Sequence, residues 1–243
     1  MRGRSDLGLR DEAVSPVYLY AVLAEAPAGA LPSGLAGEPM RLVTCEDVLA
    51  AVGDVTSPPA LDAASLRAHD AAVRRLAAAS SALLPARFGS VAFDEGQLCE
   101  TLRPRLAAFR DGLRTVRGCE QMTLRFSRLE TAAPAESAPL LEPSAPGGGP
   151  GTRYLDARRA SLGDPRALPE VRRVLDALAP LVRGERRERH DRPPLIASVY
   201  HLVGRDSLEG YRTAVESAAR AAGVRVTSSG PWPPYAFAPD ELA

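Results

Sequence analysis

Residues 131–152 contain almost only Pro, Ala, Gly, Ser and Glu, and the stretch ends in PGGGPG. A segment of this composition has little apolar surface to bury, so it adds nothing to a folded core. Its glycines match no phosphate-binding motif, because no strand precedes them and no lysine follows them. We therefore interpret the segment as a flexible linker between two folded parts. We expect a loose tail at 1–14, an N-terminal domain at 15–130 and a C-terminal domain at 153–243.

The first part mixes strand and helix patterns. Apolar runs predict strands in PVYLYAVLAE, MRLVTC and VLAAVGDV, and again in CEQMTLRFSRLE. Apolar residues three and four apart predict a helix with Leu66, His69, Val73 and Leu76 on one face, which Pro85 ends. Asp94, with Gln97 three residues later, predicts the start of a second helical stretch, and Pro104 predicts a kink in it.

The second part repeats this mixture. YLDARRASL predicts a helix start, Asp164-Pro165 a helix N-terminus, and RGERRERHDRPP a charged loop. LIASVYHLVGR and VRVTSSG predict strands, and between them Asp206 caps a helix that Gly223 ends. The fold class is therefore α+β. We expect two small domains, each a mixed sheet with helices on one face, with a ferredoxin-like arrangement in the second.

Composition excludes several functions. The 30 basic residues are all arginine and balance 30 acidic residues, so no net field favours nucleic acid or an acidic membrane. Without lysine, a P-loop or a Schiff-base site is impossible. Cys45, Cys99 and Cys119 are odd in number and far apart, which argues against a disulfide framework or a zinc ribbon and favours a reducing cytoplasm. No apolar run is long enough to cross a bilayer.

No catalytic constellation is visible. His69 lies on an apolar helix face, His190 in the charged loop and His201 within a strand, and their spacing does not suit a zinc site. No G-x-S-x-G motif exposes a nucleophilic serine. We expect a protein that is not an enzyme and that has no catalytic residue, metal or cofactor.

Two apolar segments that contain proline are not explained by a core alone. LLPARFGS places Arg87 beside Phe88, and SGPWPPYAF surrounds the single tryptophan with prolines. Pro231 to Tyr235 should be extended and polyproline-II-like, either lying back over a sheet as a clasp or facing a partner. The candidate partner-binding residues are Trp232, Pro233, Pro234, Tyr235, Phe237, Arg87 and Phe88.

These segments resemble a known family. LLPARFGSVAF, VRGCEQMTLRF, YLDARR, SGPWPPYAF and the opening VYLYAV are similar to the gas vesicle protein L/F family (GvpL/GvpF), from about Val17 to Phe237. The resemblance implies a non-enzymatic accessory protein of gas vesicles with a modified ferredoxin-like second domain. It also implies partners, namely the small hydrophobic shell protein GvpA and other accessory proteins, and an early role in wall assembly or a place as a minor vesicle component.

Two further function classes stay open. A ferredoxin-like fold also suits a small-molecule-binding or catalytic protein, which a deep pocket at His69, Arg87 or His201 beside carboxylates would favour. A nucleic-acid-binding module is the weakest alternative, given the balanced charge and few aromatic residues.

Overall fold

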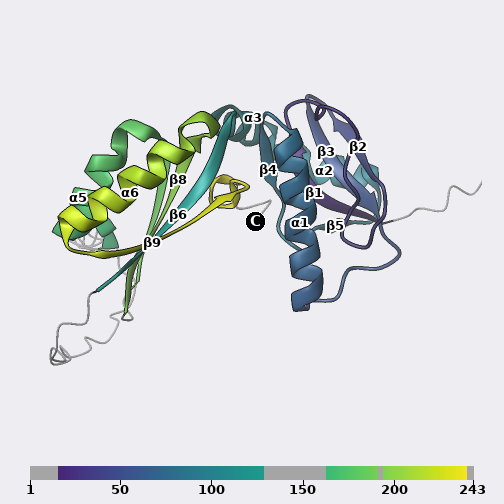
Figure 1. Ribbon diagram of the computed structural model, residues 1–243. Coiled ribbons are helices and arrows are strands. Elements are labelled where there is room, and N and C mark those ends of the chain that lie inside the picture. Colours follow the sequence, from purple (N-terminus) through teal and green to yellow (C-terminus); the bar gives the residue numbers. More distant parts are fainter. Residues whose placement is uncertain (1–15, 129–162, 191–193, 240–243) are drawn as a thin grey trace, which may run out of the picture. The chain divides into compact units, whose positions relative to one another are not determined.

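The computed structural model describes residues 16–128, 163–190 and 194–239, which form two compact units (Figure 1). The first unit runs to Arg117 and the second from Gly118 to Phe237, while Ala238 and the residues after it are grouped with the first. The predicted strand at 119–127 therefore belongs to the second unit, not to the N-terminal domain. Its partners are strands from the far end of the chain, which a search for linkers does not reveal. The predicted linker, the tail at 1–14 and the helix start in YLDARRASL lie outside the described residues.

The first unit is built on a five-stranded sheet in the order β2-β3-β1-β4, in which β5 also pairs with β1. All of these pairings are antiparallel. The three strands that the sequence predicts near its start are confirmed. The strands are β1 (Val17–Leu23), β2 (Met40–Cys45), β3 (Val48–Asp54), β4 (Leu83–Pro85) and β5 (Val91–Ala92).

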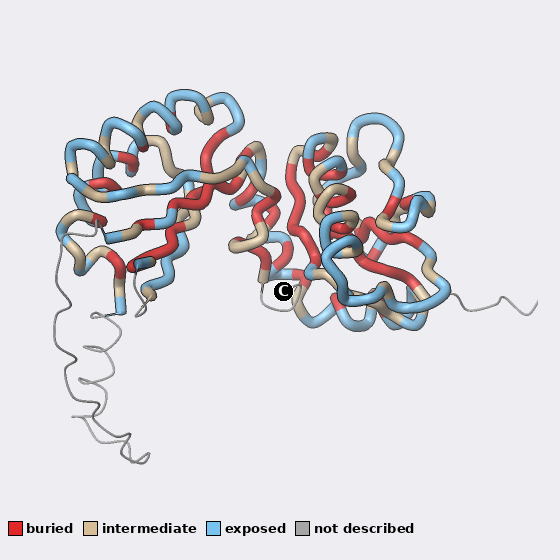
Figure 2. The backbone as a smooth tube through the Cα atoms, turned by 60° about the horizontal axis from the view of Figure 1, so that its bottom comes forward, coloured by how far each residue is buried: buried red, intermediate tan, exposed pale blue. Residues whose placement is uncertain are grey.

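Every residue of β1 is buried, so both faces of this sheet are covered (Figure 2). Tyr18 and Tyr20 pack on one face against His69 of α1 (Ala63–Ala79). Leu19 points to the other face, because successive strand residues alternate, and it lines a cavity with Leu98 and Leu102 of α2 (Glu95–Leu102). The α+β class is confirmed for this unit, with helices on both faces of its sheet rather than on one.

The kinked helical stretch is confirmed. Asp94 accepts a hydrogen bond from the backbone of Gln97 and begins α2, as predicted. A 3₁₀ turn, η1 (Arg103–Arg105), contains Pro104 and separates α2 from α3 (Leu106–Val116). Proline lacks the N–H that a continuous helix would need at this point.

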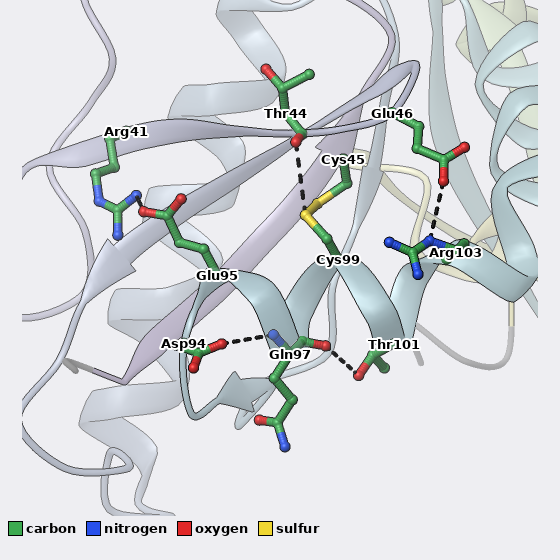
Figure 3. The surroundings of a disulfide bond; sticks show 10 residues. All are labelled: Arg41, Thr44, Cys45, Glu46, Asp94, Glu95, Gln97, Cys99, Thr101 and Arg103. Carbon is green, nitrogen blue, oxygen red and sulfur yellow. Dashed lines mark hydrogen bonds and ion pairs between the residues drawn. A yellow bond between two sulfur atoms is a disulfide. The ribbon is translucent and has the colours of Figure 1, made fainter.

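Cys45 and Cys99 form a disulfide that joins the end of β2 to α2 (Figure 3). The expectation that the cysteines stay unpaired is wrong for these two, since the fold brings their Cα atoms to 5.1 Å although 54 positions separate them. Spacing along the chain could not reveal this approach. Cysteine spacing therefore gives no argument for a reducing compartment. Cys119, in the second unit, is buried and is not disulfide-bonded to another described residue.

The second unit has a four-stranded antiparallel sheet in the order β7-β8-β6-β9. The strands are β6 (Cys119–Ser127), β7 (Val182–Arg189), β8 (Leu195–Gly204) and β9 (Arg225–Trp232). The segment RGERRERHDRPP, predicted to be a loop, mostly forms β7, an edge strand that exposes most but not all of its charged side chains. Its described elements run β6, α5, β7, β8, α6, β9, the β–α–β–β–α–β order of a ferredoxin-like arrangement.

Two helices, α5 (Pro169–Leu178) and α6 (Leu208–Ala222), cover one face of this second sheet. Met122, Leu124 and Phe126 of β6 point into this layer, as the sequence predicts. Asp164 caps a 3₁₀ turn, η2 (Pro165–Ala167), rather than α5 itself. The predicted cap from Asp206 is wrong: another 3₁₀ turn, η4 (Arg205–Ser207), leads into α6, which has no side-chain cap. Gly223 ends α6 in the left-handed conformation, as predicted.

Candidate functional site

The first candidate is the turn Ala86–Ser90, which we call the edge turn. It lies between β4 and β5, both of which pair with β1, so the chain leaves the sheet edge after Pro85 and returns at Val91. The backbone N–H of Ala86 donates to Tyr20 (2.9 Å), and the N–H of Leu19 donates to Ser90 (2.8 Å). The backbone N–H and the hydroxyl of Ser90 both donate to the Arg87 carbonyl (3.4 and 2.9 Å). These bonds fix both ends of the turn to β1.

A buried polar network supports the edge turn from below. The Tyr18 hydroxyl accepts a hydrogen bond from the N–H of Gly89 (3.0 Å) and lies 2.9 Å from Nδ1 of His69. His69 Nε2 lies 3.2 Å from the carbonyl of Ala86. Because a carbonyl only accepts, His69 Nε2 carries the proton and Nδ1 accepts from Tyr18. Gly89 has a φ of +89°, a conformation that suits glycine.

Burial sets the protonation states in this network. It lowers the pKa of His69, which favours the neutral imidazole that the hydrogen bonds require. It also raises the pKa of Tyr18 to about 12, so the hydroxyl stays protonated. His69 is thus a satisfied core residue and not a free base.

The edge turn places its two candidate residues differently. The Phe88 ring is half-buried and makes edge contacts with Tyr18 and His69, at centroid distances of 6.4 and 5.8 Å. Arg87 is exposed, and no described residue forms a hydrogen bond or an ion pair with its guanidinium. The turn therefore holds an aromatic ring inward and a free cation outward.

The second candidate is the segment Pro231–Phe237, which we call the C-terminal segment. The peptide bond between Gly230 and Pro231 is cis, and β9 continues through Trp232, which pairs with Gln121 of β6. A 3₁₀ turn, η5, follows at Tyr235–Phe237. Our expectation of a uniformly extended, polyproline-II-like stretch is therefore wrong. The segment begins as a strand and ends as a turn.

The C-terminal segment lies over the face of the second sheet that the helices leave open. The N–H of Ala236 donates to Oε1 of Gln121 at 2.8 Å. The guanidinium of Arg186 lies over the Phe237 ring, 5.7 Å from its centroid. A Cβ at Gly184 would be 3.4 Å from Phe237, so the missing side chain lets the ring approach β7. Phe237 is buried. These contacts support the clasp interpretation for Phe237.

The remaining residues of the C-terminal segment are divided between core and surface. Pro233 and Pro234 are buried, whereas Trp232 and Tyr235 are half-buried. Trp232 donates from its indole nitrogen to the Ser229 hydroxyl at 3.4 Å. The seven candidate residues thus belong to two units, with Arg87 and Phe88 in the first and the other five in the second.

His201 lies in a second buried network. Its Nε2 donates to Glu185 (3.0 Å), and its Nδ1 lies 2.7 Å from the Tyr211 hydroxyl. Burial alone would raise the pKa of Glu185, but hydrogen bonds from His201 and Arg166 outweigh it and lower that pKa to about 2. Both ring nitrogens of His201 are satisfied, and the ring is fully buried.

Two cavities of the first unit lie away from these residues. One, of about 530 Å³, lies between Val48 and α3, where Arg110 pairs with Asp47 at 3.1 Å. The other, of about 300 Å³, is the cavity lined by Leu19 and α2. His69, Arg87 and His201 line neither, so neither cavity favours a small-molecule or catalytic site at these residues.

The described residues contain neither a cluster suited to a metal ion nor a helix suited to a membrane. They contain no group of three or more His, Cys, Asp or Glu side chains that could hold a metal ion. No described helix is both long enough and apolar enough to span a membrane.

Sequence reasoning identified Arg87 and Phe88 but missed what supports them. Tyr18 is 51 positions from His69, and no local pattern links the two. One signal was present: a histidine on an apolar helix face needs partners for both ring nitrogens, and buried tyrosines are natural donors. The disulfide left no comparable signal.

Comparisons with known proteins agree over nearly the whole chain. Residues 16–239 match the family model described as gas vesicle synthesis protein GvpL/GvpF. The structure is similar to the crystal structure of the gas vesicle protein GvpF from Anabaena sp. PCC7120, with a TM-score of 0.68 and 16% identity over 93% of this chain and 98% of that one. It is also similar to GvpF from Microcystis aeruginosa, with a TM-score of 0.66 and 15% identity over 93% and 99%. No curated protein sequence matches the chain.

Proposed function

This chain belongs to the gas vesicle synthesis protein GvpL/GvpF family, and from that premise we propose that it is a non-enzymatic accessory protein of gas vesicle assembly. It binds the small hydrophobic shell protein GvpA and assists nucleation or growth of the vesicle wall, either transiently or as a minor vesicle component. The proposal places it in the cytoplasm, in association with the vesicle and other accessory proteins. The observation that carries it is the family match across residues 16–239.

The physical task would be to shield an apolar protein before it enters the wall. Such a protein can be held by apolar contact or by pairing with an open sheet edge. The first unit exposes Leu61, Leu66 and Phe93, of which Phe93 is 62% exposed. Each of these side chains could make an apolar contact with such a protein.

The edges of the second sheet also differ in a way that suits strand pairing. β7 consists mostly of Arg and Glu, and charged side chains of this kind disfavour the addition of another strand. β9 has Thr227, Ser228 and Ser229 in its exposed middle. An extended segment can therefore add to β9 more readily than to β7.

The proposal is tested by co-expressing the full chain with the gas vesicle shell protein. We expect the two proteins to co-purify and to be joined by photo-crosslinking. A photo-crosslinker is needed because this chain has no lysine for an amine-reactive reagent. A failure of both experiments, with each protein expressed and folded, would contradict the binding role. The amount of chain that stays with floated, washed vesicles separates a wall component from a transient factor.

A further inference from the structure

We propose that Arg87 is a recognition residue that binds a carboxylate on the gas vesicle shell protein. This inference rests on the proposed accessory function and specifies its chemistry. The edge turn holds the backbone of Arg87 in a fixed position, and the guanidinium makes the contact with the partner.

The first argument is the rigidity of the edge turn. Ala86, Gly89 and Ser90 use their backbone groups on β1 or on the buried Tyr18 and His69 side chains, and the Arg87 carbonyl accepts two bonds from Ser90. The backbone on either side of Arg87 is therefore already ordered before any partner binds. Binding costs less conformational entropy when the binding residue sits on an ordered backbone.

The second argument is the unused charge. Several other arginines of the first unit already have carboxylate partners: Arg41 pairs with Asp54 (2.7 Å), and Arg74 pairs with Asp70 (2.6 Å). No described carboxylate pairs with Arg87. Asp70 lies on the helix that packs beneath the edge turn, but its carboxylate is paired with Arg74 and not with Arg87. A free guanidinium with its fork of donors matches a carboxylate in a bidentate geometry.

The third argument is the apolar surface beside the charge. Phe88 follows Arg87 and touches His69, and Leu66 lies three residues before His69 on the same helix. Residues three apart on a helix are neighbours, and Leu66 is 43% exposed. An arginine next to apolar side chains that exclude water is typical of an energetic hot spot. The expected partner segment therefore carries Asp or Glu flanked by apolar residues.

The test compares the full chain with two matched variants, each co-expressed with the gas vesicle shell protein. Arg87→Gln keeps a polar side chain that can donate hydrogen bonds, but it shortens the side chain and removes the charge. Arg173→Gln makes the same change at an exposed helix position of the second unit. We expect Arg87→Gln to lower the recovery of shell protein about ten-fold, while Arg173→Gln leaves it unchanged. Both variants should keep the wild-type melting temperature, since each residue is exposed. Equal recovery with Arg87→Gln would overturn the inference and leave the proposed function intact.

A second experiment separates the inference from the proposed function. A photo-crosslinking amino acid replaces Phe88 or Leu66 in cells that form gas vesicles, and the crosslinked peptides are sequenced. Peptides of the shell protein with Asp or Glu close to the crosslink would support the inference. Crosslinks only to segments without acidic residues, or none at all, would overturn it.

Discussion

Glu185 is charged although it is half-buried, because His201 and Arg166 donate hydrogen bonds to it and Arg187 lies nearby. The network joins β7, β8, α6 and the turn η2, through His201, Tyr211 and Arg166. β8, α6 and η2 are therefore all connected to β7 through the carboxylate of Glu185. Removing it would leave the buried Nε2–H of His201 without an acceptor, which costs more than the bond itself contributes.

This carboxylate predicts an acid-sensitive stability. Its pKa of about 2 in the folded protein lies below the ordinary value of 4.5. A lowered folded-state pKa adds stability above pH 4.5, and that stability is lost as the pH falls towards 2. We expect a loss of about 3 kcal/mol from this group across that range. Denaturant titrations at several pH values should measure it.

Two variants serve as controls for this pH dependence. Glu185→Gln should be less stable at neutral pH and should lose this part of the acid sensitivity. Glu188→Gln changes an exposed carboxylate on the same strand and should keep it. If Glu185→Gln keeps the full wild-type slope between pH 4.5 and 2, the assignment is wrong.

The environment of a single residue could be predicted where burial in the core determines it, and not where a partner distant in sequence determines it. His69 was read as a core residue, and it is one. Leu66 was placed on the same inward face, yet it is 43% exposed because it lies in the first turn of α1, near the end of the helix. Periodicity gives a face of a helix but not how far along the helix the core extends.

At the scale of elements, the C-terminal segment tests the clasp interpretation. Phe237→Ala should lower the free energy of unfolding by about 3 kcal/mol, because it removes a buried ring from the sheet face. Trp232→Ala should cost less, about 1–2 kcal/mol, since that ring is only half-buried. Phe93→Ala changes an exposed ring and should leave stability within about 0.5 kcal/mol. Thermal and denaturant unfolding measure all three.

Shell-protein binding by the same variants decides between clasp and docking site. A stable Trp232→Ala protein that no longer recovers the shell protein would assign Trp232 to docking. A destabilised variant with normal binding would assign it to the clasp.

The disulfide gives a second prediction for an element. It closes a loop across 54 positions and ties α2 to the end of β2. Opening it should lower the stability of the oxidised protein by about 2–4 kcal/mol. Arg41–Glu95 and Arg103–Glu46 also hold α2, but exposed ion pairs contribute little. Unfolding with and without a dithiol reductant measures the difference.

A double variant controls for effects of the reductant itself. Cys45→Ser with Cys99→Ser should match the reduced wild type and should not respond to reductant. A response of that variant would assign the effect to Cys119 instead.

β7 shows why one element could not be predicted. Its Arg and Glu residues look like a solvated loop, because no apolar residue marks a buried face. What makes it a strand is backbone pairing with β8, from Val182 to Arg189, which leaves no trace in local composition. Strands with apolar faces, such as β1 and β6, were predicted correctly for the opposite reason.

At the scale of the whole molecule, the α+β class and the two-part organisation were predictable from the alternation of patterns. The boundary was not. Local composition marks 131–152, but β6 lies before that stretch and pairs with β8 and β9, which come after it. Long-range pairing thus decides to which unit a strand belongs, and a single sequence does not record it.

The central position of β6 has a consequence for synthesis on the ribosome. This strand emerges early, yet its two neighbours are β8 and β9, and β9 ends at Trp232. Until residue 232 has left the exit tunnel, the edge of β6 that pairs with β9 lacks its native partner. A nascent chain stalled before Arg225 would therefore present an open edge of β6 to chaperones, whereas the sheet of the first unit is complete once β5 has emerged.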